Sequence, residues 1–246
     1  MRREAYDKIA QRHLPPGYDL KKLRQMQTLL ASRVEEKDYV DENARKICGL
    51  DLAYVRQGQE ELGIASAVLY DAQEDKILEK RYVITRVDFP YIPTLLSLRE
   101  LRPMIMALKR LSENPDVILV DGHGKAHPYR LGIAAHLGVV IKRPTIGVAK
   151  SLLYGKVVCN ENEDVCNIVD EETGEIIGKA IRHHGKYVYV SVGNMITLDT
   201  AVKIVKKLLK TTSQMPLPIL HAHRLCNELK KKVKAEKSST IFDFLK

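Results

Sequence analysis

The chain has 246 residues, of which 45% are hydrophobic and 29% charged. This composition excludes an intrinsically disordered chain, and the length suits one α/β domain. The net charge of +9 and the pI of 9.3 favour a polyanionic partner, because basic surface gains affinity by releasing phosphate counterions. Part of that charge lies in residues 230–234, where a solvated basic tail would give the same total.

The cysteines and the hydropathy indicate where the protein works. None of Cys48, Cys159, Cys166 and Cys226 has the close CxxC spacing of a zinc ribbon, and no secretory leader precedes them. We therefore expect free thiols in a reducing interior. No apolar run approaches the length of a membrane span. These features predict a soluble, cytoplasmic protein, which we expect to be a monomer.

The first half of the chain is predicted to form helices and then an antiparallel meander. Apolar residues at helical spacing predict helices up to Val34, with a break at residues 15–17. Strands are predicted over 47–55, 64–70 and 77–87, joined by short connections. Residues 88–93 then form an extended loop with two prolines, and helical periodicity resumes at Thr94.

The second half alternates strands and helices. A continuously apolar run over 117–120 predicts a buried strand that delivers Asp121 to an edge of the sheet. A helix over 129–137, a strand over 145–148, strands near 176–181 and 187–192, and helices over 198–209 and from Pro218 onward follow. The whole pattern predicts an α/β fold with a mixed sheet and helices on both faces. We expect one domain over 1–235 and a flexible tail over 236–246.

Three carboxylates stand where apolar residues would be expected. Asp51 lies inside a strand, Glu100 lies among apolar neighbours on a helix, and Asp121 ends a strand. Any one of them could be an ordinary acid hydrogen-bonded to backbone. A buried carboxylate without a partner is costly, however, and three together offer the hard oxygen ligands that Mg²⁺ prefers. In a basic protein, such a cluster indicates metal-assisted cleavage of phosphodiester bonds.

Four segments resemble the endonuclease V family, in its prokaryotic and archaeal members. They are residues 49–54, 90–100, 121–128 and 147–151, and the resemblance runs in order from Tyr6 to His223. It implies an RNase H-like fold and a Mg²⁺-dependent endonuclease in which Mn²⁺ can substitute. It also implies that the enzyme recognises the deaminated base hypoxanthine and cuts the second phosphodiester bond on its 3′ side.

The resemblance also implies roles for single residues. Asp51, Glu100 and Asp121 match the metal-binding acids of the family. His223 falls where the family completes the site with His or Asp, although a helix-surface histidine without a role is the alternative.

Two more residues match positions near the scissile phosphate. Lys150 would neutralise charge that develops in the transition state; otherwise it is one more surface lysine. His127 would orient a phosphate or a water molecule, unless it caps its own loop.

Tyr91 is a candidate wedge, a side chain that stacks into the space left by a base that leaves the helix. Pro90 and Pro93 flank it and are expected to hold Tyr91 and Ile92 at the tip of their loop. The alternative is an aromatic ring packed beneath its own loop.

Gly122 and Gly124 are expected to line the base pocket with backbone. A tight wall there would reject guanine by its exocyclic amine. A backbone N–H would donate a hydrogen bond to the oxygen of hypoxanthine, and it would disfavour adenine, which has an amine at that position.

The end of the chain predicts a partner site. Ile241, Phe244 and Leu245 have i, i+3, i+4 spacing, so one helical turn would place them on one face. They resemble the sliding-clamp-binding box of replication and repair proteins, although Ser238 stands where a glutamine is usual. A tail that folds back onto the body is the alternative.

Two other functions compete with the inosine-directed nuclease. The acids alone would suit a ribonuclease H or a junction resolvase, but the loop over 90–93 has no place in a simple hybrid-cleaving nuclease. A non-catalytic nucleic-acid-binding module would be expected to have lost at least one acid. The substrate is predicted to be inosine-containing DNA or RNA, and the sequence does not separate the two.

Overall fold

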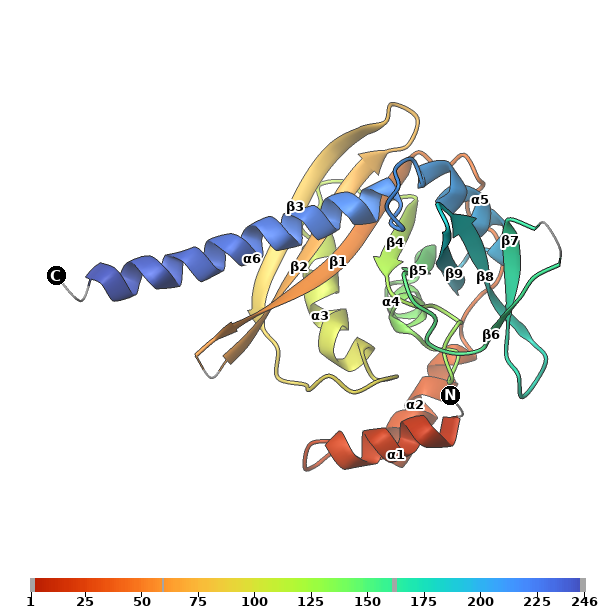
Figure 1. Ribbon diagram of the computed structural model, residues 1–246, viewed down its shortest axis with the longest axis horizontal. Helices are drawn as coiled ribbons and strands as arrows, with labels where there is room; N and C mark the ends of the chain where they lie inside the picture. Colours follow the sequence, from red (N-terminus) through yellow and green to blue (C-terminus); the bar gives the residue numbers. More distant parts are fainter. Residues whose placement is uncertain (1–2, 59, 161–162, 244–246) are drawn as a thin grey trace.

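The computed structural model of the chain describes residues 3–58, 60–160 and 163–243, with side chains up to residue 235. Two helices, α1 (Arg3–His13) and α2 (Leu20–Ala31), come first and lie beside each other at one end of the molecule (Figure 1). The described strands that follow form one nine-stranded sheet, in the order β3-β2-β1-β4-β5-β9-β8-β7-β6.

The sheet is mixed, as the sequence predicts. The predicted antiparallel meander consists of β1 (Lys46–Gln57), β2 (Glu60–Asp71) and β3 (Lys76–Arg86). Parallel pairing then joins β4 (Val117–Asp121) to β1 and β5 (Thr145–Ala149) to β4. The far half is antiparallel and contains β6 (Lys156–Val158), β7 (Val165–Val169), β8 (Ile176–His183) and β9 (Lys186–Asn194).

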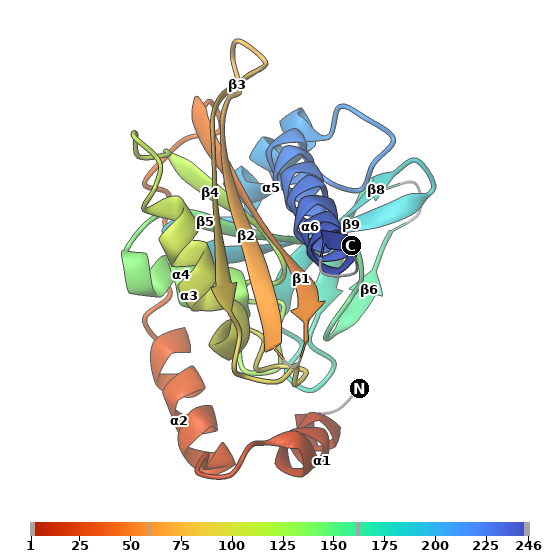
Figure 2. The ribbon, with the colours of Figure 1, turned by 90° about the vertical axis from the view of Figure 1, so that its left-hand side faces the viewer.

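Helices cover both faces of the sheet (Figures 1 and 2). One face packs against α3 (Ser97–Leu108) and α4 (Ile133–Ile141), and the other against α5 (Leu198–Leu208) and α6 (Leu217–Asp243). Alternate strand residues point to opposite faces. In β4, Leu119 therefore joins the core below α5 and the start of α6, whereas Ile118 packs below α3 and α4.

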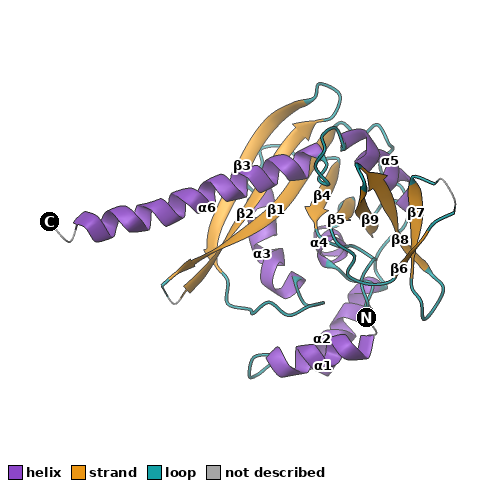
Figure 3. Ribbon diagram, in the orientation of Figure 1, coloured by secondary structure: helices purple, strands orange, loops and turns teal. Residues whose placement is uncertain are grey.

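Helix α6 begins over β1 and β2 and then continues past the body of the molecule (Figure 3). Ile241 lies in its last turn, but its side chain is outside the described part, and so are Phe244 and Leu245. The predicted clamp-binding face therefore stays a prediction. None of the described helices is both long and apolar enough to cross a membrane.

The β6–β7 hairpin corrects the prediction of free thiols. Strand pairing brings Val158 opposite Asn167, so Cys159 and Cys166 face each other across the turn with their Cα atoms 4.6 Å apart. They form a disulfide, whereas the other two cysteines are free and buried.

The helix expected over 129–137 also differs from the prediction, because it begins later. Arg130 has a left-handed φ of 54°, which an α-helix cannot accommodate, and α4 therefore starts at Ile133.

Candidate functional site

Two aspartates meet because β1 and β4 are parallel neighbours in register. Leu50 pairs with Val120, so the next residue on each strand is an aspartate, Asp51 and Asp121. Residues at matching positions of neighbouring strands point to the same face of a sheet. Here that face is the one covered by α6.

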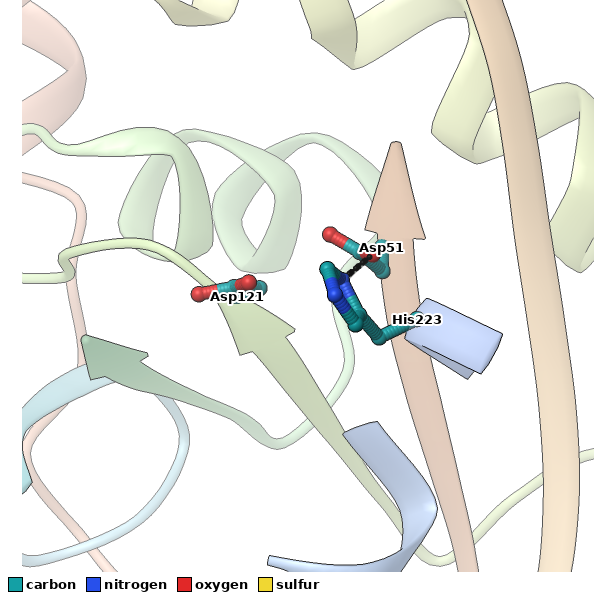
Figure 4. Close-up of side chains that lie close together, drawn as sticks. All are labelled: Asp51, Asp121 and His223. Atoms are coloured by element: carbon teal, nitrogen blue, oxygen red, sulfur yellow. Dashed lines mark hydrogen bonds and ion pairs between the residues drawn. The ribbon is translucent and has the colours of Figure 1, made fainter. Parts of the chain in front are cut away.

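Helix α6 adds a third side chain to the pair. Gly49 lets the helix approach β1 closely, since a Cβ at this position would lie 2.2 Å from the carbonyl group of Pro218. His223 then reaches the sheet, and its Nδ1 lies 2.8 Å from Asp51 Oδ2 (Figure 4). One donor atom from each of Asp51, Asp121 and His223 can be chosen so that all three lie within 4.8 Å of one another. We call these residues the metal-ligand cluster.

Glu100 belongs to the same environment, although it is not a member of the metal-ligand cluster. It is buried on α3, and Tyr54 Oη donates a hydrogen bond to its Oε1 at 2.5 Å. Burial raises the pKa of Glu100 to about 7, and the negative charges of Asp51 and Asp121 act in the same direction, against the Tyr54 hydrogen bond. Burial and then the charge of Asp121 likewise raise the pKa of Asp51 to about 6, against the bond from His223.

Burial and mutual repulsion disfavour the charged forms of Asp51 and Glu100, and a nearby positive charge would offset both effects. Lys150 is a nearby cation, with Nζ 2.9 Å from Asp121 Oδ2, and its side chain is 42% exposed. A divalent cation would supply such a charge, and carboxylate oxygens with one imidazole are donors that Mg²⁺ or Mn²⁺ accepts. The residues present therefore fit a divalent-cation site.

The loop with the predicted wedge is anchored from within. Tyr91 is 65% exposed, as a wedge requires, but Ile92 is fully buried and packs with Phe89 and Leu95. The prediction that Ile92 also stands at the tip is therefore wrong. Its burial holds the loop down, while Pro90 and Pro93 on either side are half-buried.

A cavity of about 190 Å³ lies beside Tyr91, between the loop, the end of β4 and the start of α4. Gly122 lines it, but its amide donates to Val148 O. Gly124 packs elsewhere: its amide donates to Ser191 Oγ, and a Cβ there would lie 2.0 Å from Val192 O. The expected free donors of the two glycines are therefore already bonded to the protein.

The start of α4 also reaches the cavity, which the sequence prediction missed. Ile133 lines the cavity and is the first residue of α4, and the first amides of a helix have no partner inside the helix. The predicted start of this helix, four residues too early, concealed this part of the cavity wall. Asn227 was also missed; its side-chain amide lies 3.0 Å from His223 Nε2, one helical turn further along α6.

His127 lines the cavity, but both of its ring nitrogens are hydrogen-bonded to backbone groups of the protein. It is 3% exposed, and burial lowers its pKa to about 3, so the ring is neutral. Nδ1 accepts the amide hydrogen of Tyr129, which leaves Nε2 to donate to Thr94 O at 3.2 Å. This arrangement matches a histidine that caps its own loop.

The chain matches known proteins over most of its length. The endonuclease V family model matches residues 28–224. Endonuclease V from Thermofilum pendens is 39% identical over 212 residues, which are 85% of this chain and 88% of the relative. The crystal structure of the Bacillus subtilis endonuclease V has a TM-score of 0.83 and 30% identity, and the match covers 90% of this chain and 96% of that one.

A second solved structure contains a nucleic acid. Endonuclease V from Ciona intestinalis, in complex with a 24mer DNA containing an inosine followed by a ribo-adenosine, has a TM-score of 0.79 and 27% identity. That match covers 87% of this chain and 98% of the other. These likenesses agree with the mixed sheet described above and confirm the RNase H-like fold. A family model over most of the chain, together with relatives above 35% identity, shows that this protein belongs to the endonuclease V family of nucleases.

Proposed function

We propose that the protein is a Mg²⁺-dependent endonuclease that recognises hypoxanthine in nucleic acid and hydrolyses the second phosphodiester bond on its 3′ side. The observation that carries this proposal is the adjacency of two sites. Asp121 belongs to the metal-ligand cluster, and the next residue, Gly122, lines the cavity. The inosine-containing DNA bound by the Ciona intestinalis relative supports the same substrate class.

The metal-ligand cluster and Glu100 would hold the cation. A divalent cation bound there stabilises the negative charge that develops on the phosphate during cleavage. Asp51 and Asn227 orient the ring of His223 from its two sides, and one ring nitrogen would exchange its hydrogen bond for the cation.

Lys150 would act on the substrate itself. Its ammonium group lies beside Asp121 and is exposed enough to meet a phosphate oxygen as well. A fixed cation at this position stabilises transition-state charge without rearrangement of solvent.

The cavity would select the base. Its volume of about 190 Å³ is smaller than the ~300–1,000 Å³ of pockets for drug-sized ligands and suits a single base. An amide from the first turn of α4, where Ile133 lines the cavity, would donate to the oxygen of hypoxanthine and would leave the amine of adenine without an acceptor. Tyr91 would fill the space that the base leaves in the strand. A ribonuclease H or a resolvase has no need of such a cavity.

The direct test offers inosine-containing single- and double-stranded DNA and RNA, with matched adenine and guanine controls. We expect cleavage only with inosine and a divalent cation, and none with chelator. The cut should fall at the second phosphodiester bond on the 3′ side of the inosine. Equal cleavage of the adenine controls would overturn the base specificity. Comparison of the DNA and RNA rates would identify the preferred substrate.

We infer a second partner for the tail, a sliding clamp on DNA. The spacing of Ile241, Phe244 and Leu245 supports it, and α6 runs away from the body, which would keep a bound clamp clear of the cavity (Figure 1). A clamp would tether a monomeric, cytoplasmic enzyme to DNA and raise its local concentration. Titration of the tail peptide and of its Ile241→Ala/Phe244→Ala version against the clamp tests this. Equal binding by both peptides would contradict it.

A further inference from the structure

A tight turn joins the loop of Tyr91 to helix α3. Leu95 N donates to Ile92 O at 3.0 Å, Pro93 is the second residue of the turn, and Thr94 is the third. Thr94 has a φ of +71°. This is the pattern of a type II turn, whose third residue is normally glycine, because a β-branched side chain is strained at positive φ.

Three side chains hold Thr94 in this conformation. Gln27 Nε2 donates to Thr94 O at 2.8 Å, and Arg24 Nη2 donates to Thr94 Oγ1 at 2.9 Å. His127 Nε2 also donates to Thr94 O. Arg24, Gln27 and Thr94 are all buried, so water cannot replace these bonds.

The two residues from α2 form one unit. Arg24 Nη1 donates to Gln27 Oε1 at 2.7 Å, which fixes the orientation of the amide and turns its N–H groups towards Thr94. Arg24 Nε donates to Asp7 Oδ1 at 2.9 Å, and the guanidinium lies 4.1 Å from the ring centre of Tyr129. The guanidinium is therefore held by four neighbours, and it transmits the position of α1 and α2 to the turn.

The turn lies between two walls of the cavity. Tyr91, Pro93 and Thr94 line the cavity before α3, and Leu96 and Ser97 line it where the helix begins. A change of φ at Thr94 would swing Tyr91 relative to α3, and both would move relative to the base. The conformation of one residue thus sets the shape of the cavity.

We propose that Arg24 and Gln27 are positioning residues for base recognition: they hold Thr94 in its left-handed conformation and so fix Tyr91 against α3. This inference rests on the proposed function, since it assigns these residues to the selection of hypoxanthine. Neither residue touches the base or the metal-ligand cluster. Their effect passes through the turn alone.

The sharpest variant is Gln27→Glu. It keeps the size of the side chain and the acceptor for Arg24, but it removes the shorter of the two hydrogen bonds to Thr94 O and leaves only the one from His127. Thr94→Gly is the companion variant, because glycine adopts positive φ without strain and does not need Arg24 and Gln27 to hold it there. Thr28→Val is the control, since Thr28 Oγ1 donates only to Arg24 O within α2 and does not contact the loop.

The first readout is hydrogen exchange of the Leu95 amide in the free protein. We expect Gln27→Glu to accelerate this exchange about tenfold, equivalent to about 1.4 kcal/mol, which is within the cost of a non-glycine residue at positive φ. In the Thr94→Gly background the same substitution should have little effect. An equal acceleration in both backgrounds, or none in either, would overturn the proposal.

The second readout is the Kd for an inosine-containing oligonucleotide and for its adenine counterpart. Gln27→Glu should weaken binding of the inosine strand about tenfold, leave the adenine strand unchanged and spare the single-turnover rate at saturation. Equal losses on both strands would indicate a merely structural role and contradict the proposal.

Two further comparisons keep the test decisive. Thr28→Val should match the wild type in both readouts. If Gln27→Glu does not fold, Gln27→Asn, whose shorter side chain withdraws the amide from Thr94 O, takes its place in the same cycle. A wild-type protein that fails to prefer inosine would refute the proposed function. The hydrogen-exchange readout would still test whether Arg24 and Gln27 hold Thr94 in its conformation.

Discussion

At the scale of single residues, burial determines how two acids of the site behave. Asp51 and Glu100 are both buried, and burial is the largest cause of their raised pKa values. The sequence predicted these acids because a carboxylate inside an apolar run is conspicuous. It did not predict Gln27 or Thr94, because their roles depend on a backbone φ and on a contact between residues 67 positions apart.

Tyr91→Ala tests the wedge. The side chain is exposed on a loop anchored by Ile92, so its removal should leave the fold intact. We expect binding of inosine-containing substrate to weaken by about 1–3 kcal/mol, the scale of one lost base–aromatic stack. Tyr91→Phe should retain most of the affinity. If single-turnover rates collapse while Kd is unchanged, Tyr91 is part of the catalytic geometry instead.

At the scale of elements, the buried strands and amphipathic helices were predictable, even the five-residue strands β4 and β5, whereas the β6–β7 hairpin was not. The sequence showed no periodic signal for β6, which has three residues and half-exposed or exposed side chains. The start of α4 was placed too early because Arg130 does not reveal its left-handed conformation in the sequence. That conformation is stabilised by tertiary contacts with the turn after β7.

Asp170 provides those contacts. Burial alone would raise its pKa, but hydrogen bonds and charge from Arg130, the Glu172 amide and Tyr154 hold the pKa well below its usual value. A carboxylate with a lowered pKa stabilises the fold above its unfolded-state pKa, and this contribution is lost as the pH falls through the folded-state pKa.

Asp170→Asn should therefore lower the free energy of unfolding by about 1.5–3 kcal/mol at pH 7, the scale of hydrogen bonds to a charged group. The difference from the wild type should shrink as the pH falls below about 4. Urea unfolding at pH 7, 4 and 3 measures it. A difference that stays constant over this range would show that the charge of Asp170 plays no part.

At the scale of the whole molecule, charge and shape act together. The sequence predicted the mixed sheet, because short connections indicate antiparallel strands and helical connections indicate parallel ones. It did not predict the antiparallel pairing of β5 with β9, because these strands are far apart in the sequence. Nor did it predict how far α6 projects. Lys231, Lys232 and Lys234 lie exposed on this projecting part, and among the described residues they form no ion pair with an acid.

Replacement of these three lysines by glutamine should weaken binding to undamaged DNA and flatten its salt dependence. Each lost phosphate contact reduces the slope of log K against log salt by about 0.9. The matched control replaces Lys8, Lys21 and Lys22 of α1 and α2, which are exposed, form no ion pair among the described residues and carry the same total charge. Equal slopes for the two triple variants would show that only the net charge matters.

We propose that Asp51, Asp121 and His223 would hold a divalent cation for phosphodiester cleavage beside the cavity. Asp121→Asn tests this proposal most directly. The change preserves the shape of the side chain and removes the negative charge of the metal ligand that lies nearest the cavity in sequence. At saturating Mg²⁺, single-turnover cleavage of an inosine-containing strand should fall by several orders of magnitude while its Kd stays close to that of the wild type. Near-normal cleavage by Asp121→Asn would contradict the account.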